Sequence, residues 1–251
     1  MASVYDLSRL GDLTGLEDRW AIAGLLTLSF AALARWVRGV TTAGAVAGAV
    51  SCFVLYLGGG PTAFAALVTV FVLAWFATRL GYQRKQNLGI AEKRDGRNAS
   101  QVAANLGVAT TCAATFVLGS HHFGWLLATA SALSEAAADT VSSEVGQAFA
   151  HRARLITNWE SVPAGTNGAV SLTGTLAGVA AAGIVSLVCA AGNLFPRDLL
   201  VVSAGAAILG MVADSFLGAW FERRGLLNND SVNFLSTLVA ALASAWLTRA
   251  G

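Results

Sequence analysis

The chain has 251 residues, of which 55% are hydrophobic and only 12% are charged, with a formal net charge of +2 and a mean hydropathy of +0.63. Soluble globular domains carry about 25% charged residues, so the composition excludes an ordinary soluble domain, and we expect no nucleic-acid partner. The apolar residues fall in long unbroken blocks, which indicates one integral membrane domain over residues 1–251.

The N-terminal segment, residues 1–19, is predicted to lie outside the membrane, since it lacks the basic start and apolar core of a signal or transit peptide. Eight apolar segments follow, and a membrane-spanning helix needs about 20 residues. They are residues 20–36, 40–57, 61–78, 101–119, 123–139, 168–191, 199–221 and 232–249. Tryptophans suit the membrane interface, and five lie at or near the predicted ends: Trp20, Trp36, Trp125, Trp220 and Trp246. The sequence predicts an all-α, polytopic transmembrane bundle of seven to eight helices, because a barrel would alternate with period two.

The basic residues are distributed unevenly between the two sets of connections. Of the 16 lysines and arginines, 12 fall in connections that follow odd-numbered spans and four fall elsewhere. The positive-inside rule therefore predicts a multi-pass cell-membrane protein with loops at about 79–100, 140–167 and 222–231 in the cytoplasm. These loops are also the polar ones, so we expect a functional site to face the cytoplasm.

Cysteine and histidine indicate neither a disulfide nor a metal site. Cys52, Cys112 and Cys189 lie inside apolar spans without CxxC spacing, which is typical of small buried side chains. His121 and His122 fall on the side with few basic residues, where we expect interfacial side chains rather than ligands.

Three acids follow an apolar run in "SALSEAAADTVSSEVG". Glu135 and Asp139 share a helical face, and Glu144 lies about one and a half turns further on. A carboxylate inside a bilayer is costly unless it is paired, hydrated or bound to a cation. The small residues around the acids, with Ser142 and Ser143, favour a packed site, whereas the simpler alternative is a helix that has already left the membrane.

Another acid, Asp214, lies in the middle of the span 199–221, where so short a side chain cannot reach water. Its surroundings, "VADS", are similar to "AADT" at 137–140, which hints at two Asp-bearing helices that face one cavity. Oxygen ligands of this kind favour Mg²⁺, which is usually held by one or two carboxylates with phosphate oxygens and water. The same acids could instead form a proton or sodium pathway.

The turn "PAGTNGAVS", residues 163–171, leads directly into an apolar helix. Its glycines free the backbone, its polar residues can cap the helix, and the first amide groups of the helix could bind a phosphate. The residues concerned are Gly165, Thr166, Asn167, Gly168 and Ser171. A purely structural cap is the alternative, and no Walker motif occurs in the chain.

Two further polar clusters flank apolar helices. The first belongs to the loop "LGIAEKRDGRNASQVAANLG" and consists of Lys93, Arg94, Arg97, Asn98, Gln101 and Asn105. Its cations could bind lipid headgroups, but the amides that continue into the helix suit a polar ligand better. The second cluster, in "NNDSVNF", provides Asn229, Asp230 and Asn233, of which the first could be a cap.

Five motifs, in this order and spacing, resemble the integral-membrane prenyl-phosphate kinase family, formerly a domain of unknown function and typified by phytyl-phosphate kinase of chlorophyll-phytol salvage. The motifs are "KRDGRNASQVAANLG", "AAADTVSSEVG", "PAGTNGAVSLTGTLAG", "VADSFLGAW" and "NNDSVNFLST". The resemblance covers roughly residues 40–250. It implies transfer of a phosphate from a nucleoside triphosphate to phytyl or geranylgeranyl monophosphate, which gives the prenyl diphosphate. CTP as the donor is implied by the resemblance alone.

The resemblance and the residue chemistry together give each polar group an expected role. Asp139 and Asp214 are the expected catalytic residues, and together with Glu144 and Asp230 they are expected to bind Mg²⁺. The expected phosphate and nucleotide ligands are Lys93, Arg94, Arg97, Asn98, Gln101, Asn105, Gly165, Thr166, Asn167, Gly168, Ser171, Asn229 and Asn233. Glu135, Ser142 and Ser143 are expected to contact these groups, and not the ligand itself, and so to hold them in position.

Three other functions are compatible with parts of the sequence. A prenyl alcohol kinase would need Asp139 or Asp214 to deprotonate a hydroxyl group. A transporter or flippase would use the intramembrane acids for cation or proton coupling, but it predicts polar groups on both membrane faces. A membrane scaffold leaves Asp214 unexplained. The length of the prenyl chain and the oligomeric state stay open.

Overall fold

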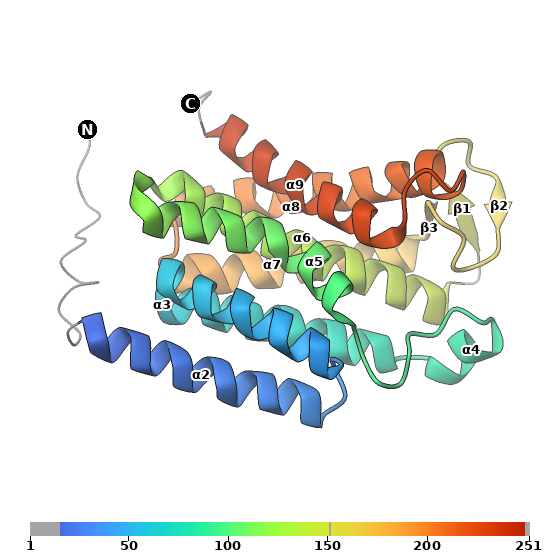
Figure 1. Ribbon diagram of the computed structural model, residues 1–251. Coiled ribbons are helices and arrows are strands. Elements are labelled where there is room, and N and C mark those ends of the chain that lie inside the picture. The colour runs from blue at the N-terminus through green and yellow to red at the C-terminus, as the bar shows by residue number, and fades with distance from the viewer. Residues whose placement is uncertain (1–15, 151, 249–251) are drawn as a thin grey trace.

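The computed structural model describes residues 16–150 and 152–248, and these residues form an all-α bundle, as the sequence predicts (Figure 1). The described α-helices are α2 Leu16–Trp36, α3 Thr42–Arg79, α4 Tyr82–Asn87, α5 Ala99–Thr115, α6 Phe123–Phe149, α7 Leu172–Ala191, α8 Leu200–Leu217 and α9 Asn229–Leu247. Three short helical turns extend them: η1 Phe116–Ser120, η2 Arg197–Leu199 and η3 Gly218–Glu222. Most of the predicted N-terminal segment, residues 1–15, lies outside the described residues, and α2 begins at Leu16.

Helix α3 is a hairpin of two antiparallel helices. Its Gly60 has φ 61° and ψ −153°, which is not helical, and a proline follows. A straight helix of this length, 38 residues, would extend about 57 Å. Yet the indole N–H of Trp75 donates a hydrogen bond of 3.2 Å to the carbonyl of Val37, which precedes the helix. The chain therefore reverses at Gly60, and α3 contains both of the spans predicted at 40–57 and 61–78.

The outer surface of the bundle suits lipid. Five described helices are long and apolar enough to cross a membrane: α3, α5 with η1, α7, α8 with η2 and η3, and α9. Large apolar side chains point outward from them and from α2, among them Leu28 at 70% exposure and Val201 at 78%. The prediction of an integral, multi-pass membrane protein is thereby confirmed.

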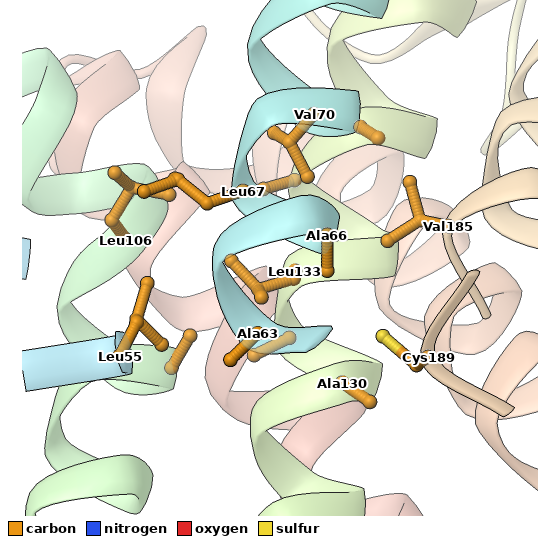
Figure 2. Packing of buried hydrophobic residues seen from close by; sticks show 14 of the residues in the cluster. Leu55, Ala63, Ala66, Leu67, Val70, Leu106, Ala130, Leu133, Val185 and Cys189 are labelled. Carbon is orange, nitrogen blue, oxygen red and sulfur yellow. The ribbon is translucent and has the colours of Figure 1, made fainter. Parts of the chain in front are cut away.

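Helix α6 is the central helix of the bundle. It packs against α3, α5, α7, α8 and α9, and every residue from Leu127 to Ala138 is buried. Figure 2 shows Ala130 and Leu133 of α6 surrounded by side chains of α3, α5 and α7, such as Leu67, Leu106 and Val185. Small residues allow this close approach. The core of the bundle therefore forms around the helix that carries three of the predicted site acids.

The connections with most of the basic residues gather at one end of the bundle, together with α4 and the strands (Figure 1). We call this the α4 end. Helix α6 continues to Phe149 instead of ending at Asp139, so the predicted loop 140–167 is partly helical. Three strands, β1 Ala153–Leu155, β2 Ser161–Val162 and β3 Ala169–Val170, form an antiparallel sheet in the order β2-β1-β3. The sheet was not predicted from the sequence, because strands this short show no period-two pattern.

The cysteines and histidines lie where the sequence predicts. Cys52, Cys112 and Cys189 are buried and free. His121 and His122 are exposed immediately before α6, whose other end contacts α4 through Arg84. Because α6 is 27 residues long, the histidines lie about 40 Å from the α4 end.

Candidate active site

A polar cavity of about 460 Å³ lies at the α4 end, between α6, α8, the start of α9 and two loops. The predicted site residues that line it are Lys93, Arg97, Gln101, Asp139, Ser142, Ser143, Glu144, Gly165, Thr166, Asn167, Gly168, Ser171, Asp214, Asn229 and Asn233. These residues come from all five sequence motifs. The fold therefore brings most of the predicted site residues together in one place.

The acids of α6 and α8 meet at the inner wall of this cavity. The carboxyl groups of Asp139 and Asp214 are hydrogen-bonding neighbours, and two carboxyl groups in contact must share a proton or a cation. The Oδ2 atom of Asp214 is buried without a hydrogen-bond partner, and so is the Oε1 atom of Glu135. Glu135 is 1% exposed and lies behind the pair. The inner wall is thus rich in carboxyl groups and has oxygens with spare bonding capacity.

Arg97 is the cation nearest to the acid pair. It interacts electrostatically with Asp139, and its Nη2 donates to the Oγ1 atom of Thr140 at 3.2 Å. Its backbone is held by the turn between α2 and α3, where its N–H donates to Gly39 and its carbonyl accepts from Thr41. Arg97 therefore reaches the acids from a rigid backbone position, as a phosphate-binding residue requires.

The glycine turn at 164–171 forms another wall of the cavity. Gly165 and Gly168 have φ values of 85° and 76°, which favour glycine. A β-carbon on Gly168 would lie 2.5 Å from the backbone nitrogen of Ala219, which belongs to the π-turn η3. Ser171 caps α7 by accepting from the N–H of Gly174 at 3.1 Å. The turn is therefore packed tightly against η3, with its shape determined by the two glycines.

Gly168→Ala is expected to lower the stability of the protein by about 2–4 kcal/mol, because the left-handed backbone and the contact with Ala219 both oppose a methyl group. Gly225→Ala is the matched control. Gly225 has φ 70°, but a β-carbon on it would meet no atom within 4 Å, so this variant should lose only about 1 kcal/mol. Unfolding in mixed micelles measures both changes, and equal losses would contradict the tight packing of the turn.

Glu144 is engaged by a lysine that the sequence analysis did not single out. Lys85 of α4 is fully buried and forms an ion pair with the Oε2 atom of Glu144. The ammonium group also donates to the carbonyl of Thr78 at 2.7 Å, and the Thr78 hydroxyl donates to Oε1 of Glu144 at 3.3 Å. Glu144 thus links α6 to α3 and α4, and its binding of Mg²⁺ stays a prediction.

Five predicted site residues do not line the polar cavity. Glu135 lies behind it, and the other four lie elsewhere. Asn98 caps α5 in a reciprocal capping box with Gln101. Arg94 and Asn105 line a neighbouring cavity. Asp230, in the first turn of α9, lines neither of the two. The structure thus places three of the four carboxylates that were predicted to bind Mg²⁺ in the walls of the polar cavity, namely Asp139, Glu144 and Asp214.

The cavity also contains polar residues that the sequence analysis did not single out: Glu92, Thr140, Gln147, Ser215 and Glu222. Glu92 accepts from the amide group of Gln101 at 3.2 Å, and its place next to the basic cluster could have marked it. Glu222 faces the cavity from the last turn of η3, and π-turns are frequent at functional sites. A π-turn cannot be recognised from the residue pattern.

A second cavity, of about 340 Å³, adjoins the polar one and is mainly apolar. Side chains of α2, α3 and α5 line it, such as Phe30, Leu67 and Leu106. The two cavities share Glu92, Lys93 and Arg97 in their walls. An amphiphilic ligand could therefore place its apolar part in one cavity and its polar group in the other.

The donor set of the polar cavity fits Mg²⁺ in part. The available groups are carboxylate, hydroxyl and amide oxygens, which Mg²⁺ prefers. Across residues 16–150 and 152–248, no three Asp, Glu, His or Cys side chains converge into a ready metal site. A pair such as Asp139 and Asp214 still suffices, because Mg²⁺ usually takes one or two carboxylates and completes its shell with phosphate oxygens and water.

Comparison with known proteins agrees with this architecture. Residues 25–241 match the family described as "Integral membrane protein DUF92". An uncharacterised membrane protein of Methanocaldococcus jannaschii is 33% identical over 229 residues, which are 89% of this chain and 92% of that protein. No solved structure matches this chain.

Two further relatives match a smaller share of this chain. The Arabidopsis thaliana protein called "Protein VTE6, chloroplastic" is 32% identical over 194 residues, which are 74% of this chain and 58% of that protein. An uncharacterised membrane protein of Synechocystis is 35% identical over 179 residues, which are 68% of this chain and 69% of that protein.

Proposed function

Because the chain belongs to the DUF92 family of integral membrane proteins, we propose that it transfers a phosphate from a nucleoside triphosphate, with CTP favoured, to a prenyl monophosphate. The product is the prenyl diphosphate. The relationship to Protein VTE6 supports this proposal, as do the five motifs that resemble prenyl-phosphate kinases.

The observation that carries the proposal is the junction between the two cavities. The polar cavity offers cations, acids and a glycine turn to a nucleotide, and the apolar cavity offers space for a lipid chain. Lys93 and Arg97 belong to both walls. A phosphate at this junction would contact the polar side chains of one cavity while its lipid chain filled the other.

The residues around the junction suit phosphoryl transfer. An oxygen of the acceptor phosphate attacks the terminal phosphorus of the nucleotide, and the bond from that phosphorus to its bridging oxygen breaks. The nucleoside diphosphate leaves with the electron pair. A phosphate monoester is already anionic at neutral pH, so the reaction needs positioning and charge neutralisation rather than a strong base.

Each group in the cavity has a defined part in this proposal. Lys93 and Arg97 neutralise phosphate oxygens, and the amides of the turn at Gly165 and Gly168 bind the nucleotide phosphates. Asp139 and Asp214 would hold Mg²⁺, which when bound reduces the negative charge on the transferring phosphate. Since nucleotides are cytosolic, we propose that the α4 end faces the cytoplasm.

The deciding assay uses purified protein in nanodiscs with Mg²⁺, labelled CTP or ATP, and phytyl or geranylgeranyl monophosphate. Labelled prenyl diphosphate is expected. EDTA should abolish its formation, and added Mg²⁺ should restore it. Product from prenyl alcohols instead of monophosphates would establish the alcohol kinase. If folded protein gives no product with any donor and acceptor, the kinase proposal fails and the result favours a transporter or flippase that uses the intramembrane acids.

A further inference from the structure

The rim of the apolar cavity carries cations from the basic motif and two further arginines that lie outside the five sequence motifs. Its charged residues are Arg38, Arg79, Glu92, Lys93, Arg94 and Arg97. Glu92 is the single acid among them, and its carboxylate already accepts from the backbone N–H of Lys93 and the side-chain amide of Gln101. Five cations therefore surround the mouth of a cavity whose inner wall is apolar.

Arg38 and Arg79 are the two rim cations that no motif includes, and the fold holds both of them in place. The guanidinium group of Arg79 lies 3.7 Å above the ring of Trp75 and donates to the carbonyl of Val37 at 2.8 Å. Arg38 is the residue after Val37 in the chain, and its φ is 55°. Such a value costs free energy in a residue other than glycine. The turn between α2 and α3 thus presents one arginine beside another.

The apolar part of the cavity extends deep into the bundle. Leu67 lies twelve residues before Arg79 on the same helix, so the lining reaches about 18 Å along the axis. Gly48, on the facing half of α3, also lines the cavity, and the nearest atom to a β-carbon there would be 3.9 Å away. A β-carbon at Gly48 would therefore fit without displacing its neighbours, and a larger side chain would take up space in the cavity that Gly48 lines.

We propose that this cavity is the acceptor site, in which Arg38 and Arg79 bind the phosphate of a single-chain isoprenoid monophosphate and Gly48 leaves room for its chain. The inference rests on the proposed function for the identity of the ligand. Charge complementarity carries it, because the rim holds five cations and one acid, so a neutral alcohol would leave an excess of positive charge that a phosphate monoester dianion neutralises.

Binding without turnover tests the two arginines. The probes are labelled geranylgeranyl phosphate and geranylgeraniol, measured against protein in nanodiscs without nucleotide. Arg38→Gln and Arg79→Gln should each weaken binding of the phosphate about tenfold and leave binding of the alcohol unchanged. Arg35→Gln is the matched control, because Arg35 lies on the same helix end but bonds to Thr42 outside the cavity, and it should change neither affinity.

Chain length tests the cavity itself. Gly48→Phe should weaken binding of the twenty-carbon phosphate at least tenfold and retain binding of geranyl phosphate, which also shows that the variant is folded. Gly48→Ala should behave as the unaltered protein. If Gly48→Phe loses both ligands, Ala31→Phe decides, because Ala31 lines the same cavity from α2 and the same selective loss is expected.

The outcomes separate this inference from the proposed function. If both arginine variants bind the phosphate normally, the acceptor site lies elsewhere even when the protein forms prenyl diphosphate. If dioleoyl phosphatidic acid displaces the probe at equal concentration, the cavity holds an ordinary membrane lipid and the inference fails. If the arginine variants behave as expected but no donor gives product, the acceptor site stands and the proposed reaction fails.

Discussion

Asp139→Asn and Asp214→Asn are each expected to reduce the kcat of prenyl diphosphate formation at least about a hundredfold. Asparagine has nearly the same shape but no charge, so the variants lose the groups that would hold Mg²⁺ beside the transferring phosphate, and losses of this kind typically cost 10² to 10³ in rate. Initial rates with labelled nucleotide and saturating prenyl phosphate measure the effect.

Stability measurements separate a functional from a structural role for these acids. The carboxyl groups of Asp139 and Asp214 face each other, and relief of their repulsion should keep the unfolding midpoint unchanged or raise it. Asp95→Asn is the control, because Asp95 is exposed in the same loop as Lys93 and lines neither cavity. Variants of the pair that are folded and fully active would refute the assignment.

Lys85→Met is expected to lower the free energy of unfolding by about 3–5 kcal/mol, because it leaves Glu144 without its ion-pair partner in a largely buried place. The double variant Lys85→Met with Glu144→Gln should recover most of this loss, since no isolated charge remains. Lys93→Met should change stability little, because Lys93 is exposed. Denaturation with SDS in mixed micelles gives the values.

The double variant makes this prediction specific. If Lys85→Met is harmless, or if the second substitution adds to the loss, the ion pair does not hold α4 against α3 and α6. Glu144→Gln alone should also destabilise the protein, because it leaves the Lys85 ammonium unpaired. A coupling energy between the two positions follows from the complete cycle.

The fold was predictable because its signal is local. Each apolar block is as long as a membrane helix, and the turn at Gly60, before Pro61, separates the two blocks that form the antiparallel halves of α3. The acids Asp139 and Asp214 were also predictable, because a short carboxylate inside an apolar span has a high cost that a structural role alone does not explain. These inferences need no knowledge of which helices are neighbours.

The rest of the site depends on which helices are neighbours. Lys85 lies in the polar stretch "YQRKQN", which predicts an exposed loop residue. In the structure it is fully buried. Arg38 lies in the turn between α2 and α3, far from the basic loop in the sequence. It comes together with that loop only in the fold, where both line the apolar cavity. Conversely, Asp230 lies within a motif but does not line the cavity. Spacing along the chain cannot reveal such contacts between distant segments.

The burial of α6 has a consequence for how the chain is assembled in the membrane. Among the described helices, α6 is not one of the five that are apolar enough to cross on composition, and each acid near the middle of a bilayer costs about 2.5–3.5 kcal/mol on insertion scales. Three of the helices that enclose it, α7, α8 and α9, are synthesised after it. The helix made in the middle of translation therefore gains its full support only when the last helix has emerged from the ribosome.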